Sequence, residues 1–144
     1  MISGAGTLYG NNPIHHGLVH FNTTGQNKSM IITGVKLSCG EHLMAIQMQY
    51  NNTWGEKYGL CAPDCVYPVT HVDTNEFDST EWFNRADVSV IDGFPWALTL
   101  HTNKRHLPTC GVHSNEPNSA RGASLVGIAG YSGCWLDRLQ FIWS

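Results

Sequence analysis

The sequence predicts an all-β domain, and three observations support this prediction. Apolar residues occur in short runs or alternate with polar ones, and no long segment has helical periodicity. Clusters of Gly, Asn, Pro and Asp separate these runs at intervals of about 8–12 residues, which is typical of β barrels, sandwiches and prisms. The chain has 144 residues, of which 42% are hydrophobic. It therefore suits a single domain, residues 1–144, with one core.

About ten strands are expected, in order along the chain. The clearest are residues 29–38 and 41–50, which a short Cys-Gly link joins as a hairpin. Weaker strands are expected within residues 18–21, 56–60, 65–72, 86–91, 96–102 and 124–130, and a last strand follows Gly133. The segment from Asp73 to Arg85 has no clear alternation and is expected to be a long loop.

The composition limits the classes of partner. Only 13% of the residues are charged, whereas about a quarter are charged in an average soluble domain. The formal net charge is −3, which favours neither nucleic acid nor an anionic membrane as a partner. No apolar run in the sequence approaches the roughly 20 residues of a membrane span.

Cysteines and glycosylation sequons together favour secretion, with the cytoplasm as the alternative. The first ten residues lack the regions of a signal peptide, so secretion implies a mature form. The cysteines are Cys39, Cys61, Cys65, Cys110 and Cys134, and the sequons begin at Asn22, Asn27 and Asn51. Because the cysteine count is odd, one thiol is free or bridges to another chain. A disulfide from Cys61 or Cys65 to Cys39 or Cys110 is favoured over half a zinc site.

One carboxylate interrupts the apolar face of the last strand. The alternating residues of that face are Trp135, Asp137, Leu139, Phe141 and Trp143. An unpaired carboxylate inside an apolar face is costly to bury, but Asp137 lies at the beginning of the strand, next to a glycine-rich turn. Asp137 therefore either fastens this turn by accepting backbone N–H groups or binds a ligand at the turn.

A sugar is the ligand that these residue types suit best. A carboxylate accepts hydrogen bonds through two oxygens, so neighbouring sugar hydroxyls can donate to both. Gly133 lets a ligand approach the backbone closely, since it has no Cβ. Trp135 offers an apolar wall for the C–H face of a sugar ring. The turn from Gly133 to Asp137 is therefore predicted to bind carbohydrate without a metal ion or other cofactor.

Several segments resemble the jacalin-related lectins. Gly133 and Asp137 match the G-x-x-x-D loop of that family, within a stretch, residues 124–142, that is similar to the C-terminal part of these lectins. Residues 32–59 resemble the family segment that leads through a tyrosine to a glycine. Thr102 and Asn103 match its Thr-Asn pair. The order and spacing of these segments, rather than any one of them, make the resemblance specific.

The resemblance implies a β-prism of three four-stranded Greek-key sheets with pseudo-threefold symmetry, in which the N- and C-terminal strands pair. It also implies that a glycine-rich loop near the N-terminus joins the sugar site and that backbone amides and one carboxylate contact the sugar. The expected carbohydrate-binding residues are Gly4, Ala5, Gly6, Gly133, Cys134, Trp135 and Asp137. The uncleaved N-terminus resembles the mannose- and glucose-preferring members, so mannose-type glycans or glycoproteins are the expected partners.

Other functions are less well supported by the sequence. A glycosidase needs two carboxylates across a cleft, and nothing pairs Asp137 with Glu41, Asp73 or Glu81. The chain is therefore not expected to be an enzyme. Shallow sugar sites bind weakly and gain from avidity, so a homodimer is expected. The alternative is a secreted structural or matrix interaction protein with the same fold and no sugar site.

Overall fold

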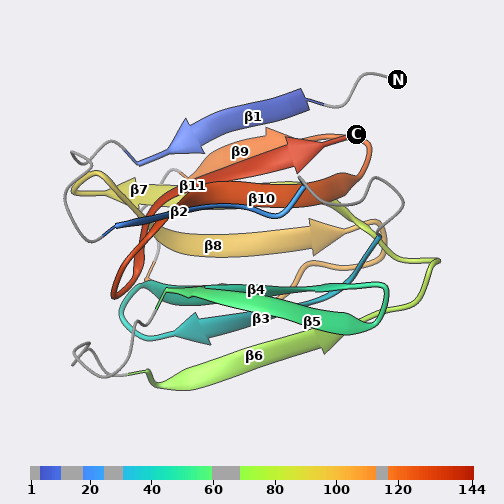
Figure 1. The fold of residues 1–144 in the computed structure, drawn as a ribbon, viewed down its shortest axis with the longest axis horizontal. Coiled ribbons are helices and arrows are strands. Elements are labelled where there is room, and N and C mark those ends of the chain that lie inside the picture. The colour runs from blue at the N-terminus through green and yellow to red at the C-terminus, as the bar shows by residue number, and fades with distance from the viewer. Residues whose placement is uncertain (1–3, 11–17, 25–30, 60–68, 113–116) are drawn as a thin grey trace.

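The computed structural model describes residues 4–10, 18–24, 31–59, 69–112 and 117–144, and these ranges form eleven strands (Figure 1). The strands are β1 (Gly4–Tyr9), β2 (Val19–Asn22), β3 (Ile32–Cys39), β4 (Leu43–Tyr50), β5 (Thr53–Gly59), β6 (His71–Glu76), β7 (Phe83–Ile91), β8 (Phe94–Thr102), β9 (Asn118–Arg121), β10 (Leu125–Ser132) and β11 (Leu136–Trp143). Within the described ranges there is no helix of the length and apolarity that a membrane span requires.

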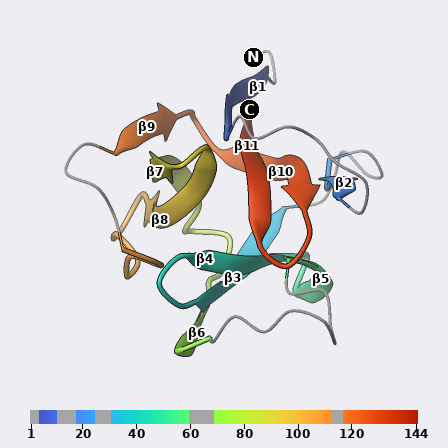
Figure 2. The same ribbon diagram turned by 90° about the vertical axis from the view of Figure 1, so that its left-hand side faces the viewer.

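Three antiparallel sheets surround one core, as Figure 2 shows. The strand order is β1-β11-β10-β2 in the first sheet, β5-β4-β3-β6 in the second and β8-β7-β9 in the third. The third sheet has three strands among the described residues. On its β8 edge, residues 106–110 form isolated bridges, Leu98 with Cys110 and His101 with His106, in place of a full fourth strand. The predicted all-β prism, with its N- and C-terminal strands paired, is confirmed.

Most predicted strands are present, and the differences lie at sheet edges. The hairpin of β3 and β4 is confirmed, with Leu37 opposite Ile46. Three edge strands were either not predicted or predicted with different bounds. β1 is rich in glycine, β9 has four mainly polar residues, and β6 extends into the segment expected to be a loop. Each pairs with an inner strand, and this pairing supplies the main-chain hydrogen bonds that the local sequence does not signal.

The predicted alternation along the last strand is confirmed. Leu139, Phe141 and Trp143 of β11 are buried, whereas the alternating residues Arg138, Gln140 and Ile142 are partly exposed. These inward side chains join a core to which every sheet contributes. Its largest fully buried members are Phe83, Phe141, Leu37, Leu43, Met44, Ile46, Met48, Leu98, Leu100, Ile128, Leu136 and Leu139.

A disulfide links two sheets through the core. Cys39 at the end of β3 bonds to Cys110 beside β8, with the two Cα atoms 5.3 Å apart. The expectation that one of these cysteines pairs with Cys61 or Cys65 is therefore wrong, because they pair with each other across 71 positions of sequence. Cys134 is also disulfide-bonded. Cys61 and Cys65 lie outside the described residues.

An ion pair joins the segment before β7 to the turn after β8. The Arg105 guanidinium donates to both oxygens of the Glu81 carboxylate, at 2.9 and 3.5 Å, and the Thr102 hydroxyl donates at 2.6 Å. The Arg105 hydrogen bond is the main cause that lowers the pKa of the Glu81 carboxyl below 4.5, and burial opposes it. Since the folded-state pKa is lowered, the stabilisation is present above pH 4.5 and is lost as pH falls through the lowered value.

We expect Glu81→Gln to lower the free energy of unfolding at neutral pH, because a neutral amide makes a weaker bond with Arg105. The variant should also lose less stability than the wild type between neutral pH and about pH 3. Urea unfolding of both proteins at the two pH values measures this. Glu41→Gln, at an exposed side chain, is the control. An unchanged acid dependence in Glu81→Gln would contradict the assignment.

Candidate functional site

Three turns between strands lie at one end of the prism, together with Gly10, which follows β1. The turns join β3 to β4, β7 to β8 and β10 to β11, and they lie on the left in Figure 1 and face the viewer in Figure 2. The start of β1 and the end of β11 lie at the opposite end of the prism (Figure 1). The turn predicted to bind a ligand, from Gly133 to Asp137, therefore has neighbours from all three sheets.

A β-bulge lies at the start of β11, beside Asp137. Tyr131 pairs with Arg138, but Ser132 pairs with Leu136, so Asp137 is an extra residue in β11. As a result two consecutive side chains, Leu136 and Asp137, are both buried, which a regular strand does not allow. Asp137 lies on the same inward face as Leu139 and Phe141, and the bulge adds the Leu136 side chain to that buried face.

The carboxylate of Asp137 is held close to the turn before it. The N–H of Gly133 donates to the carbonyl oxygen of Trp135 at 2.9 Å and closes the turn. A Cβ at Gly133 would lie 3.8 Å from the Oδ1 atom of Asp137. Asp137 is only 6% exposed and has interactions within the protein, so it is a fixed group rather than a free surface charge. The missing Cβ of Gly133 leaves space beside the Asp137 carboxylate.

Two glycines that the site prediction did not include pack against this turn. Gly10, just after β1, has a φ of 106°, and a Cβ there would lie 2.5 Å from the carbonyl oxygen of Asp137. The same Cβ would lie 3.1 Å from the carbonyl oxygen of Gly93, in the turn between β7 and β8. Three backbone segments therefore meet at a point that leaves no room for a side chain.

Aromatic rings line the same end of the prism. Trp135 makes edge contacts with His42, at 5.3 Å between ring centroids, and with Phe94, at 5.7 Å. His42 also packs against Trp96 at 4.4 Å. The predicted apolar wall at Trp135 is therefore one ring of a cluster to which each of the three sheets contributes.

The structure does not bring Gly4, Ala5 and Gly6 to this end. Gly4 pairs with Trp143 and Ala5 with Ile142, so these residues lie at the far end of β11. The reason is the antiparallel pairing of β1 with β11, which places the start of β1 beside the end of β11. The end of β1 and Gly10 therefore lie beside Asp137. The signals for Gly10 and Gly93 in the sequence were the turn clusters around them, at residues 9–13 and 91–95.

The structure describes two of the three asparagines that begin glycosylation sequons. Asn22 and Asn51 are exposed, and each side-chain oxygen accepts a backbone hydrogen bond, from Thr24 at 2.9 Å and from Ile31 at 3.0 Å. Asn27 lies outside the described residues.

One cluster has the residue types of a metal site. Cys39, His71 and Asp73 offer ligand atoms within 4.8 Å of one another. Cys39 is disulfide-bonded and so supplies no thiolate. The cluster is therefore not a metal site.

The family follows from comparison with known proteins. The sequence profile of the jacalin-like lectin domain matches residues 9–142. The chain belongs to this family. Membership of a lectin family supports carbohydrate binding rather than catalysis. A comparison with curated protein sequences gave no significant match.

Solved lectin structures show the same fold as this family member. A Calsepa lectin in complex with a bisected glycan superposes with a TM-score of 0.74 at 18% identity, covering 98% of this chain and 96% of the lectin. Malaysian banana lectin gives a TM-score of 0.71 at 20% identity, with 98% and 96% covered. AcmJRL, described as a mannose-binding jacalin-related lectin from Ananas comosus, gives 0.72 at 16%, with 97% and 96% covered.

We expect Gly10→Ala to lower the free energy of unfolding by about 2 kcal/mol, since the positive φ and the contact with Asp137 both disfavour a Cβ. The amide signals of the turn from Gly133 to Asp137 should shift in the ¹H–¹⁵N NMR spectrum. The matched control is Gly6→Ala, on the same strand, where the nearest contact would be 3.3 Å, to Phe141. Equal effects of the two substitutions on that turn would contradict the close packing at Gly10.

Proposed function

We propose that this chain binds mannose- or glucose-type glycans, without a metal ion, at the end of the prism where Gly10, Gly93 and the turn from Gly133 to Asp137 meet. The observation that carries the proposal is the close approach of Gly10 to the carbonyl oxygens of Asp137 and Gly93. The end of β1 and two turns thus meet next to the residue that carries the carboxylate. The family of the chain supports a sugar as the ligand. AcmJRL, of the same fold, is described as mannose-binding, which supports the choice of sugar.

The chemistry of the proposed site uses groups that this chain supplies itself. The Asp137 carboxylate accepts from two neighbouring hydroxyls, and charged acceptors form the stronger hydrogen bonds. The backbone amides of Cys134 and Trp135 donate to sugar oxygens, and Gly133 allows the ring to approach. The half-buried Trp135 presents an apolar surface at the edge of the turn.

In this proposal Gly10 takes the role that the sequence assigned to Gly4, Ala5 and Gly6. Gly10 lies beside Asp137, whereas those three residues lie beside Phe141, Ile142 and Trp143. A ligand held at Asp137 is therefore next to the end of β1, not its beginning.

We expect Asp137→Asn to weaken binding on a mannose-glycan array at least about tenfold, because a neutral acceptor makes weaker bonds to sugar hydroxyls. Thermal unfolding and the NMR spectrum must show that the fold is kept, since Asp137 is buried. The control is Glu41→Gln, an exposed carboxylate at the same end of the prism.

A second variant tests the same site without changing the carboxylate. Gly133→Val adds a side chain between Leu18 and the Asp137 Oδ1 atom, where a Cβ would lie 3.2 and 3.8 Å away. It should block the approach of a sugar. Wild-type binding by folded Asp137→Asn and Gly133→Val would refute the site.

We also propose that the protein is a secreted homodimer. The Cys39–Cys110 disulfide and the bonded state of Cys134 support an oxidising compartment. A single shallow site gives weak binding, so two sites on one particle would supply avidity. We expect sedimentation to give twice the chain mass of 15.9 kDa and yeast cells to agglutinate, with free mannose as inhibitor. A monomer that agglutinates nothing, or reduced cysteines in the native protein, would contradict this.

A further inference from the structure

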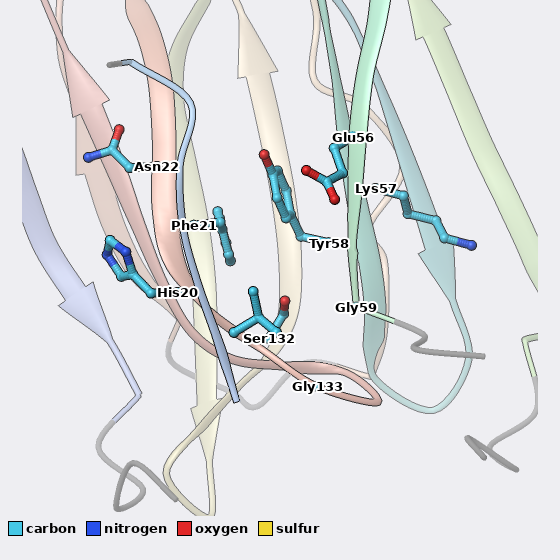
Figure 3. Close-up of a pocket in the computed structure, with 10 residues that line it drawn as sticks. His20, Phe21, Asn22, Glu56, Lys57, Tyr58, Gly59, Ser132 and Gly133 are labelled. Atoms are coloured by element: carbon cyan, nitrogen blue, oxygen red, sulfur yellow. The ribbon is translucent and has the colours of Figure 1, made fainter. Parts of the chain in front are cut away.

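A groove begins at the proposed sugar turn and runs between two sheet edges. Its walls are β2, the edge of the first sheet, and β5, the edge of the second (Figure 3). Its volume is about 450 Å³, and Ser132 and Gly133 line the end beside the turn. A second hollow of about 250 Å³ shares Asn22, Glu56 and Tyr58 with it and continues as far as Gly55.

An aromatic pair forms the middle of the groove. Phe21 of β2 stacks on Tyr58 of β5, with ring centroids 4.2 Å apart and planes 11° from parallel. Phe21 is buried, whereas Tyr58 is half-buried and lines both hollows. The pair bridges two sheets that do not hydrogen-bond to each other among the described strands, and it gives the groove an apolar surface.

A carboxylate lies beside the aromatic pair. In Figure 3 the Glu56 side chain is directed into the gap beside Tyr58, whereas Lys57 is directed away from it. Burial, and then the charge of Glu56, raise the pKa of the Tyr58 hydroxyl, which agrees with this proximity. Glu56 is exposed, and no hydrogen bond or ion pair of its carboxylate occurs among the described residues. It is therefore available as a charged acceptor for a ligand.

We infer that this groove binds the further sugar rings of a glycan whose first ring is held at the turn from Gly133 to Asp137. The inference rests on the proposed function, since Gly133 belongs to both places. The aromatic surface suits the C–H face of a sugar ring, and the Glu56 carboxylate suits its hydroxyls. The strand from Gly59 to Gly55 spans about 13 Å, at about 3.3 Å per residue, which is longer than one sugar ring.

An extended peptide is the competing occupant, because β2 and β5 are edge strands of their sheets among the described residues. Continuity with the proposed sugar turn favours a glycan. The presence of an aromatic surface beside the Glu56 carboxylate also favours a glycan, since peptide addition to an edge depends on main-chain hydrogen bonds rather than on such side chains.

The test compares a single ring with a chain of rings. Calorimetry measures the affinity of methyl mannoside and of a mannose trisaccharide for the wild type, Glu56→Gln and Glu41→Gln. We expect Glu56→Gln to weaken the trisaccharide about tenfold, the effect of one charge-assisted hydrogen bond, and to leave methyl mannoside unchanged. Glu41→Gln, the matched control at an exposed carboxylate that does not line the groove, should change neither. Intermolecular NOEs from the Tyr58 ring to the trisaccharide should be present in the wild type.

The outcomes separate this inference from the proposed function. Equal wild-type affinities for the two sugars, or equal effects of Glu56→Gln on both, would overturn the groove and leave the sugar turn intact. Wild-type protein that binds neither sugar would overturn both. NOEs from Tyr58 to an extended peptide, with none to the trisaccharide, would assign the groove to a peptide and also overturn the inference.

Discussion

The antiparallel pairing of β1 with β11 is the constraint on which the site depends. It adds β1 to the edge of the first sheet, beside the last strand, and it fixes which part of the N-terminal segment meets Asp137. Because the two strands run in opposite directions, the start of β1 lies beside Trp143 and the residue after its end lies beside Asp137. A parallel arrangement would have brought Gly4 to the carboxylate instead. The position of the glycine that matters is thus set by strand direction, not by local composition.

The contact at Gly10 also explains why so few charged residues are needed. Where three turns meet with no space for a Cβ, the surface offered to a ligand consists largely of main chain. One fixed carboxylate and nearby aromatic rings then supply the remaining contacts. The burial of Asp137 fits this arrangement, since a carboxylate held by its own turn keeps one orientation. The two functions considered for Asp137, fastening the turn and accepting a ligand, are therefore compatible.

The three sheets do not share hydrogen-bonded strands among the described residues, so side chains must join them. The Cys39–Cys110 disulfide connects the second sheet to the third, and the Phe21–Tyr58 stack connects the first to the second. Around Trp135, rings from all three sheets meet. The contacts that hold the prism together are thus the same ones that shape the end of the prism and the groove between β2 and β5.

The sequence by itself determined the class of the fold, the β3–β4 hairpin, the inward face of β11 and the turn from Gly133 to Asp137. These depend on alternation and turn residues, which are local properties of the chain. Only the tertiary structure decided that Gly10 and Gly93 adjoin that turn, that Cys39 pairs with Cys110, that β1 and β9 form strands, and that β6 extends to Glu76. It also decided that a bulge places Leu136 beside Asp137 on the buried face. Each of these features depends on a partner distant in sequence, and local patterns carry no record of which partner a segment meets.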